Sequence, residues 1–549
     1  MDNLWYKTAV VYELYIKGFK DSSSDGKGDF PGLTSKLDYL KELGVDCLWL
    51  LPTYPSPGFD DGYDVMDYHS VNSDYGSLKD FVVFLDEAHK RGMKVLTELV
   101  LNHTSDRHPW FIEAKKGPQS KFHDYYVWSD TNDKYSGARV IFTDSELANW
   151  SWCNDCKKYY WHRFYHHQPD LNFENPEVRE EMKKIMSFWL DLGVDGFRVD
   201  AVPYLFEREG TNCENLEETH IYMKEIRRFI DAHYKGRVLL AEANQWPTDL
   251  LPYFGDNDEF HMAFNFPLMP RMFMAIKQEH HGPIVDIINK MPSIPDQCQW
   301  LIFLRNHDEL TLEMCTDEER DYMYSQYAYD AQMKINIGIR RRLAPLMEND
   351  RRKIELLYAM LFTLPGSPVI YYGDEIGMGD NIYLGDRNGV RTPMQWDENK
   401  NSGFSDSKPS MLYAPVITDP EYNFNAVNVS AQLANQNSLL NFIKDMIKLR
   451  KLYNNSLIFG CGEIKFIYPE NKKILVYTRK YGEDIVLCSF NLARTPQPVV
   501  IDLKEYEGYE PIEIYGGAKF PLIGSLPYLL THSPYGFYLF YLKKPHQQG

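Results

Sequence analysis

Strand-like apolar runs alternate with helix-like segments through the first four fifths of this 549-residue chain. A strand over residues 10–14, a helix over 33–43 and a strand over 45–51 open the series. Parallel strands need such helical crossovers, because two strands of the same direction cannot be joined by a tight turn. The repeated pattern therefore predicts an α/β fold in which eight strands close into a (β/α)8 TIM barrel.

The longest break in this rhythm lies between residues 103 and 170, a stretch dense in Trp, Tyr, His and Asp. Loops of that length are usually functional, so we expect an inserted subdomain after the third strand. Two further insertions, 207–218 and 316–350, are expected to overhang the same rim. The eight strands are expected at residues 10–14, 45–51, 94–100, 196–200, 238–242, 260–266, 300–304 and 368–372.

After a closing helix over 438–451 the pattern changes to short strands, which predicts a small antiparallel domain. The expected domains are the barrel over 1–102 and 171–455, the subdomain over 103–170 and a C-terminal β-sandwich over 456–549. Its clearest strands are expected at 463–467, 474–478, 485–491 and 537–542.

Charge and composition exclude several classes of partner. A formal net charge of -19 argues against nucleic acid and anionic membranes. The longest apolar region, 356–372, is interrupted by Pro365, Gly366 and Pro368, so we expect no membrane span. The chain opens with neither a basic nor an apolar segment, and its eight cysteines are scattered. Both features predict a cytoplasmic protein with free thiols.

Three carboxylates follow strand-like runs. Asp200 and Glu242 close two such runs directly, and Asp308 comes shortly after a third. The carboxyl ends of parallel barrel strands meet at one rim, so these acids can converge although the sequence separates them widely. A surface-loop role is a reasonable alternative for any single one of them. Three acids in equivalent positions favour a shared site.

Carboxylate pairs of this kind suit the cleavage of glycosidic bonds. Retention of configuration needs an ionised nucleophile and a protonated acid roughly 5–5.5 Å apart. Arg198 lies two residues before Asp200 on the same strand face and would keep Asp200 ionised. Glu242 follows four apolar residues, a setting that raises the pKa of a carboxyl towards neutrality. His307 could hold sugar hydroxyls.

These residues, together with 60–64 and 101–106, resemble the motifs of the α-amylase superfamily. The resemblance implies that Asp200 is the nucleophile that forms a β-glucosyl-enzyme, Glu242 the acid/base and Asp308 a clamp on ring hydroxyls. It implies that Tyr63 stacks beneath the glucosyl ring, which other residues bind. A purely structural role remains open for Tyr63 and for Arg391. The implied ring-binding residues are Asp60, His103, Arg198, His307 and Arg391.

Five longer segments are more similar to the trehalose synthases within that superfamily. The similarity implies interconversion of maltose and trehalose, with some hydrolysis to glucose. A retaining α-glucosidase is the alternative, and a non-catalytic sugar-binding protein is disfavoured because all three acids are present. No organic cofactor is expected, while a homo-oligomer and a separate maltokinase partner are expected possibilities. The similar segments are 161–172, 204–215, 241–246, 261–273 and 305–313.

Isomerisation requires the released sugar to stay in the pocket while water stays out. We expect a lid from residues 208–213 and 322–342, which include the bulky Tyr324 and Tyr327. Gln168 is expected to help hold the second sugar. An ordinary loop or an oligomer contact is the alternative reading of these segments.

Two cation sites are expected. The resemblance places a structural Ca2+ on oxygen donors of Asn102, Asp170 and Glu207 and on the main-chain carbonyls of Tyr204 and Leu205. A second Ca2+ or Mg2+ is expected in a loop whose oxygen spacing is similar to the start of an EF-hand. This loop departs from the EF-hand at Gly32, where a Glu would stand, and a solvated acidic turn is the alternative. Its candidate ligands are Asp21, Ser23, Asp25, Lys27 and Asp29.

Overall fold

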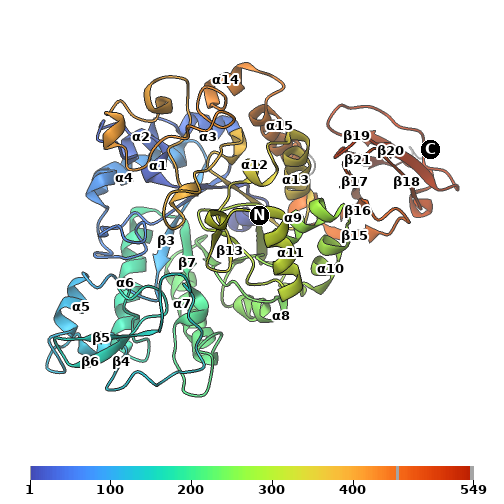
Figure 1. The fold of residues 1–549 in the computed structure, drawn as a ribbon. Coiled ribbons are helices and arrows are strands. Elements are labelled where there is room, and N and C mark those ends of the chain that lie inside the picture. The colour runs from blue at the N-terminus through green and yellow to red at the C-terminus, as the bar shows by residue number, and fades with distance from the viewer. Residues whose placement is uncertain (1, 453–456, 545–549) are drawn as a thin grey trace.

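The computed structural model describes residues 2–452 and 457–544 (Figure 1). Eight parallel strands form a closed barrel in the order β1-β14-β10-β9-β8-β7-β3-β2. This confirms the expected TIM barrel. The strands are β1 (Val11–Leu14), β2 (Cys47–Leu50), β3 (Lys94–Val100), β7 (Gly196–Asp200), β8 (Val238–Ala241), β9 (Met262–Phe264), β10 (Gln299–Phe303) and β14 (Ser367–Tyr371).

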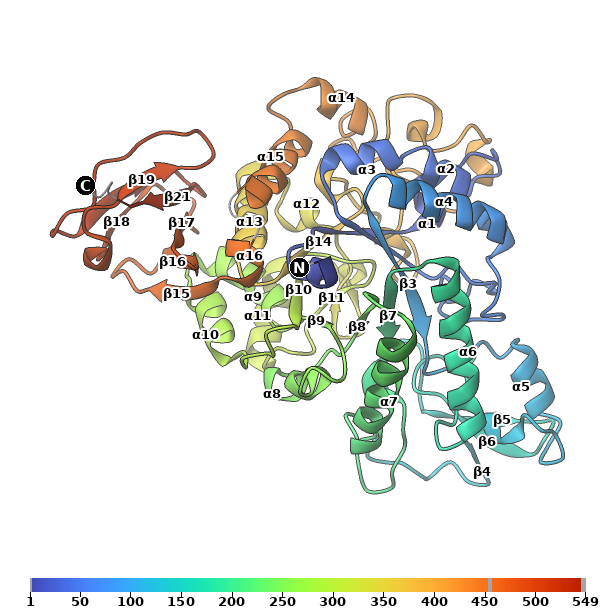
Figure 2. The same cartoon turned by 180° about the vertical axis from the view of Figure 1, so that it is seen from behind.

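Helices on the outside of the barrel connect these strands (Figure 2). Local sequence fixes their ends: α4 begins with a capping box between Ser77 and Asp80, and α6 is followed by Gly193 in the left-handed region. The barrel helices are α3 (Leu37–Leu43), α4 (Leu78–Lys90), α6 (Pro176–Leu192), α7 (Glu217–His233), α9 (Leu268–Gln278), α10 (Gly282–Lys290), α13 (Arg351–Thr363) and α15 (Leu439–Leu452). Shorter helices are α1 (Ile16–Phe19), α2 (Phe30–Thr34), α8 (Pro247–Leu250), α14 (Val429–Ala434) and α16 (Leu457–Cys461).

The helix expected over 33–43 is two helices. The Asp29 side chain accepts a hydrogen bond from Gly32 N and starts α2 before the expected position, and Pro31 lies in its first turn. The Ser35 N–H closes α2 against Pro31 and Leu33, and α3 then starts afresh at Leu37. Capping by Asp29 therefore explains why α2 starts before the expected helix.

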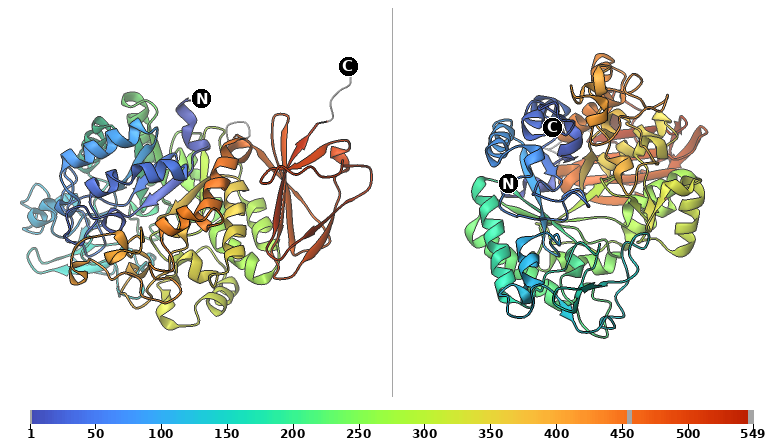
Figure 3. Two further views of the ribbon diagram at one scale, coloured as in Figure 1. Left: turned by 90° about the horizontal axis from the view of Figure 1, so that it is seen from above. Right: turned by 60° about the vertical axis from the view of Figure 1, so that its left-hand side comes forward.

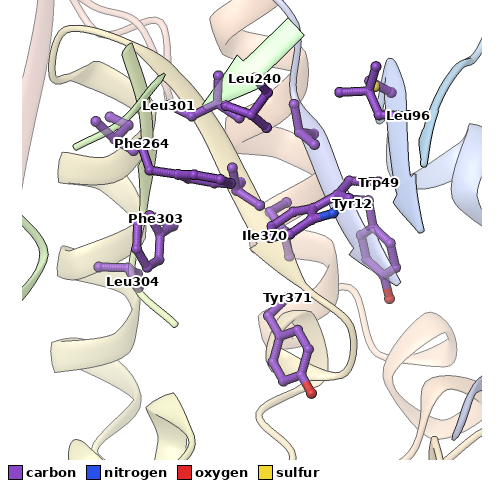
Figure 4. Packing of buried hydrophobic residues seen from close by; sticks show 14 of the residues in the cluster. Tyr12, Trp49, Leu96, Leu240, Phe264, Leu301, Phe303, Leu304, Ile370 and Tyr371 are labelled. Atoms are coloured by element: carbon purple, nitrogen blue, oxygen red, sulfur yellow. The ribbon is translucent and has the colours of Figure 1, made fainter. Parts of the chain in front are cut away.

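Large apolar side chains fill the inside of the barrel. Figure 4 shows Trp49, Leu240, Phe264 and Leu301 meeting from different strands, and none is more than 3% exposed. Every residue of β1, β2, β7, β8 and β10 is buried. Close packing of this kind fixes the strands relative to one another, and with them the side chains at their carboxyl ends.

Two insertions extend beyond the carboxyl ends of the strands. The first, after β3, contains α5 (Pro109–Ala114) and a small sheet of β4 (Trp128–Ser129), β5 (Trp150–Cys153) and β6 (Lys158–Trp161). The second, after β10, contains α11 (Asp317–Tyr327), α12 (Leu343–Leu346) and a sheet of β11 (Leu310–Thr311), β12 (Lys334–Ile335) and β13 (Gly338–Ile339).

The C-terminal part is antiparallel, as expected, and lies at the opposite end of the molecule from α5 (Figure 3, left). A five-stranded and a two-stranded sheet share one cluster of buried apolar residues. Three of these strands, β18, β19 and β20, were not expected. β18 contains Pro498 and β19 contains Pro511, and a proline weakens the sequence pattern of a strand. The strands are β15 (Glu463–Ile467), β16 (Ile474–Tyr481), β17 (Asp484–Asn491), β18 (Gln497–Ile501), β19 (Glu510–Glu513), β20 (Tyr528–His532) and β21 (Phe537–Lys543).

No helix within residues 2–452 and 457–544 has both the length and the apolar character that crossing a bilayer requires.

Shortening a side chain inside the barrel should destabilise the fold. Leu240 is 0% exposed, so Leu240→Ala leaves a cavity among rigid neighbours and should lower the free energy of unfolding by about 2–5 kcal/mol. The control is Leu526→Ala in the C-terminal domain, where the side chain is 81% exposed and the change should be small. Guanidinium unfolding followed by circular dichroism measures both, and equal midpoints for the two variants would contradict the packing argument.

Candidate active site

A pocket lies at the carboxyl ends of the barrel strands, and the three expected acids line it together. Asp200 is the last residue of β7, Glu242 directly follows β8, and Asp308 lies five residues beyond the end of β10. Three of the expected ring-binding residues also line the pocket, Asp60, His103 and His307, and so does Tyr63, which was expected to stack beneath the ring.

A single buried guanidinium joins the two acids that could act on a glycosidic bond. Arg198, on β7, donates to Asp200 Oδ1 at 2.5 Å and lies 2.6 Å from Glu242 Oε1. It also donates to Glu98 Oε2 at 2.8 Å, and its side chain is 2% exposed. Asp200 and Glu242 are therefore both bound to one cation. Glu98, on β3, is a third carboxylate that binds the same cation.

Burial dominates the titration of these acids. It raises the pKa of Asp200 to about 6, although the Arg198 cation opposes the rise. It raises the pKa of Glu242 to about 7, again against Arg198, and the charges of Asp200 and Asp308 add to the rise. At neutral pH Asp200 is mostly ionised and Glu242 is about half protonated. Arg198 therefore offsets only part of the rise in pKa that burial causes at Asp200. Its effect on the ionisation of Asp200 is smaller than the sequence analysis expected.

His307 and Asp308 form a second charged unit. His307 Nδ1 lies 2.6 Å from Glu13 Oε1, and Nε2 lies 3.1 Å from Asp308 Oδ2. Although burial opposes it, the charges of Asp308 and Glu13 raise the pKa of His307 to about 9. Burial also opposes ionisation of Asp308, but the cations around it hold its pKa well below the usual range. The ring of Tyr63 stacks on His307 with an interplanar angle of 12°.

Arg387, which the sequence reasoning missed, lines the pocket. It donates to Asp308 Oδ1 at 2.8 Å and to Asp60 Oδ1 at 2.6 Å. The expected Arg391 lies behind it and donates to Asp308 Oδ1 at 3.1 Å and to Asp61 Oδ2 at 2.8 Å. Both arginines belong to one loop outside any strand, so strand periodicity could not show which of them would face the pocket.

Gln168 lies behind the pocket wall. Its side chain is 0% exposed and donates to Asp60 Oδ2 at 2.8 Å. It is not among the lining residues. The geometry therefore gives Gln168 the role of positioning Asp60, in place of the expected contact with a second sugar.

The outer wall of the pocket comes from the two insertions that follow β3 and β10. Ile141, Phe142 and Phe164 reach it from the first insertion, and Glu309, Thr311 and Glu313 from the second. An ion pair joins the two insertions at this mouth, with Arg139 Nη1 lying 3.3 Å from Glu313 Oε1. Asn244 Nδ2 donates to the same carboxylate at 2.9 Å.

The aromatic residues expected to form a lid have other positions. Tyr327 is buried, and its hydroxyl donates to Phe273 O at 2.8 Å, so it belongs to the core. Tyr324 and residues 208–213 are not among the pocket-lining residues either. The outer wall in this structure comes instead from Ile141, Phe142, Phe164 and the segment 309–313, and a lid made of residues 208–213 and 322–342 stays a prediction.

The first expected cation site has a donor set that fits a hard cation. Asn102 Oδ1, Asp170 Oδ2 and Glu207 Oε1 are buried, and none has a hydrogen-bond partner within the described chain. Burial raises the pKa of Asp170 to about 8 and raises the pKa of Glu207 well above its usual range. Buried oxygens without partners are costly, and a cation bound there would remove that cost.

The loop from Asp21 to Asp29 is arranged differently. Asp21 Oδ1 accepts hydrogen bonds from the N–H groups of Ser23 and Ser24, and Asp29 Oδ1 accepts one from Gly32. The Lys27 ammonium forms an ion pair with Asp74 at 2.7 Å. In the described chain none of the buried side-chain oxygens that lack a partner belongs to this loop. The carboxylates therefore already stabilise the turn, and the fit to a cation is weaker here.

Comparison with known proteins places this architecture in a family. The model of the α-amylase catalytic domain matches residues 13–459, and the model of the maltogenic amylase C-terminal domain matches residues 464–539. A solved structure of the trehalulose synthase MutB from Pseudomonas mesoacidophila is 26% identical, with a TM-score of 0.78 over 98% of this chain and 99% of that one.

Two similar curated proteins are a trehalose synthase/amylase of Mycolicibacterium smegmatis and a trehalose synthase of Thermus thermophilus. The first is 56% identical over 99% of this chain and 93% of its own length. The second is 53% identical over 99% of this chain and 56% of its own length. The barrel, the three acids at its rim and these identities lead to one conclusion. The chain belongs to the trehalose synthase family of the α-amylase superfamily.

Proposed function

We propose that this enzyme interconverts maltose and trehalose by intramolecular glucosyl transfer, with a minor release of glucose by hydrolysis. The family relationship supports the substrates. The observation that carries the mechanism is the pairing of Asp200 and Glu242 on one buried Arg198, inside a pocket whose mouth is crossed by side chains of both insertions. The alternative is a retaining α-glucosidase that passes the glucosyl unit to water.

In the first step a carboxylate oxygen of Asp200 attacks the anomeric carbon of the non-reducing glucosyl unit of maltose. The bond between that carbon and the bridging oxygen breaks, and Glu242 gives its proton to the departing 4-oxygen of glucose. The products are a β-glucosyl ester on Asp200, an ionised Glu242 and a neutral glucose. Asp308, His307 and Arg387 surround the place where the ring must lie and can hold its hydroxyls.

In the second step the released glucose turns and presents its anomeric hydroxyl to the same carbon. Glu242 takes the proton from this hydroxyl, the new carbon–oxygen bond forms, and the ester bond to Asp200 breaks. Two inversions give net retention, so the product is trehalose. Attack by water at this stage gives two glucose molecules, so exclusion of water decides between the two outcomes.

The arrangement at the mouth supports containment. Arg139 pairs with Glu313 and with Glu214, so the first insertion is tied to the chain after β10 and to the loop after β7. Phe142 and Phe164 pack against each other in the same wall, with ring centroids 5.5 Å apart. A sugar behind these contacts leaves more slowly than through an open rim. Homo-oligomerisation, a maltokinase partner and a cytoplasmic location remain predictions.

The function is tested by incubating the protein with maltose and following the sugars by proton NMR. The parent should form trehalose as its main product, and Asp200→Asn should lower turnover by about a thousand-fold or more, because the nucleophile is lost. A 5-fluoro-α-glucosyl fluoride should label the peptide that contains Asp200. Glucose as the main product of the parent would favour the glucosidase, and a label elsewhere would contradict the role of Asp200.

The pH dependence follows from the two raised pKa values. Asp200 loses its nucleophilic form as pH falls through about 6, and Glu242 loses its donatable proton as pH rises through about 7. For maltose, kcat/KM should therefore fall on both sides of a narrow optimum between these values. For α-glucosyl fluoride the alkaline fall should be absent, because fluoride leaves without a proton. An equal alkaline fall with both substrates would contradict the role of Glu242.

We also propose that Asn102, Asp170 and Glu207 hold a structural Ca2+ that ties the first insertion to the barrel rim and takes no part in the chemistry. After treatment with a chelator, calcium at about 100 times its dissociation constant should add about 2.7 kcal/mol of stability. The melting temperature and bound calcium per chain measure this. Asp170→Asn should abolish the gain, whereas Glu180→Gln on the exposed face of α6 should keep it. A full gain in Asp170→Asn would contradict this site.

A further inference from the structure

Two cysteines lie close together in a hairpin turn of the first insertion, away from the sugar pocket. β5 and β6 pair antiparallel with Cys153 opposite Lys158, and residues 154–157 connect the two strands. Figure 1 shows this hairpin on the opposite side of the molecule from the C-terminal domain. Neither Cys153 nor Cys156 is among the residues that line the pocket. The pair is therefore separate from the sugar chemistry proposed above.

The turn brings the two cysteine side chains to the same side. The Lys157 N–H donates to Cys153 O at 3.0 Å, which closes a single helical turn, and Lys157 has a φ of 56°. In a turn of this kind the side chains of residues three apart are neighbours. Cys153 and Cys156 have this spacing, and a disulfide needs Cα atoms roughly 4.4–6.8 Å apart, a separation that one helical turn provides.

The two thiols interact directly and differ in their access to solvent. Burial first, and then a hydrogen bond with the Cys153 thiol, raise the pKa of the Cys156 thiol to about 11. Both cysteines are free thiols; Cys153 is 7% exposed, whereas Cys156 is half-buried. A reagent in solution therefore reaches Cys156 first, and Cys153 lies beside it as a second sulfur that can displace the reagent.

The charged side chains around the turn are paired with one another. Lys158 lies 2.6 Å from Asp130, and Lys115 lies 3.3 Å from Asp155, which stands between the two cysteines in the sequence. These lysines are thus engaged with carboxylates, in agreement with the raised pKa of Cys156. A dithiol whose thiolate is not stabilised favours the disulfide, because the reduced form gains nothing from ionisation.

Zinc binding is the other common use of two cysteines at this spacing. A structural zinc ion takes four ligands. Within residues 2–452 and 457–544, no group of three or more His, Cys, Asp or Glu side chains is placed to hold a metal ion. The surroundings of Cys153 and Cys156 therefore favour redox chemistry between the two sulfurs over a metal site.

We propose that Cys153 and Cys156 form a reversible dithiol–disulfide site that low-molecular-weight disulfides oxidise. The Cys156 thiolate attacks one sulfur of such a disulfide, the bond between the two reagent sulfurs breaks, and one thiol leaves after taking up a proton. Cys153 then loses its proton and attacks the Cys156 sulfur, and the second thiol leaves. Two electrons pass from the protein to the reagent, so the products are one intramolecular disulfide and two small thiols.

The test incubates the folded, reduced protein in a series of glutathione and glutathione disulfide mixtures. The protein is then denatured in N-ethylmaleimide, which alkylates the remaining thiols, and digested with trypsin for mass spectrometry. Both cysteines fall in one tryptic peptide, 140–157, because Arg139 and Lys157 are the flanking cleavage sites. This peptide should change from doubly alkylated to an unalkylated form that lacks two hydrogens. The change should need about ten-fold less oxidant than the binding of glutathione to the half-buried Cys461.

Two variants separate the roles of the two sulfurs. Cys153→Ser should stop at a mixed disulfide between Cys156 and glutathione, whereas Cys156→Ser should leave the buried Cys153 reduced. Cys461→Ser is the matched control and should still form the disulfide. A peptide that stays doubly alkylated throughout the series would overturn the proposal, and so would a parent that keeps glutathione on Cys156 without closing the ring. If a variant fails to fold, the peptide masses of the parent decide.

Discussion

The Arg198 guanidinium is the interaction on which the rest of the site depends. It is buried inside a closed barrel, and its three carboxylate partners, Glu98, Asp200 and Glu242, come from three consecutive strands of that barrel. A buried cation must be paired, and buried carboxylates need a cation, so the strands and the charges hold each other in place. The same burial raises the pKa of Glu242 to about 7 and that of Asp200 to about 6, values that suit the proposed acid and the proposed nucleophile.

The two ends of the pocket differ in the contacts that hold their side chains in place. At the glucosyl end, Asp60 and Asp308 are fixed by arginines that are themselves buried. At the mouth, side chains come from two long insertions that meet through ion pairs and ring contacts. The first arrangement suits the proposed bond breaking, which needs fixed groups, and the second suits the admission of a disaccharide, which the proposed function requires. An isomerase needs both, because its intermediate must wait for one particular sugar.

Much of the fold was predictable, because strand and helix periods are local properties of the sequence. β3 and β7 begin and end where the pattern predicts, and the three acids follow from the geometry of strand ends. Arg387 was not found, because it lies in a loop whose orientation depends on distant neighbours. Gln168 was assigned to a sugar because the sequence cannot show that its side chain turns to Asp60.

The central claim is that the glucose released from the Asp200 ester returns to it without leaving the pocket. An equal mixture of unlabelled maltose and maltose labelled with carbon-13 in both rings tests this directly, with the trehalose analysed by mass spectrometry at early conversion. The account predicts trehalose that is either fully labelled or unlabelled. Trehalose labelled in one ring, at the statistical share of one half, would show that the sugars exchange through solution and would contradict the account.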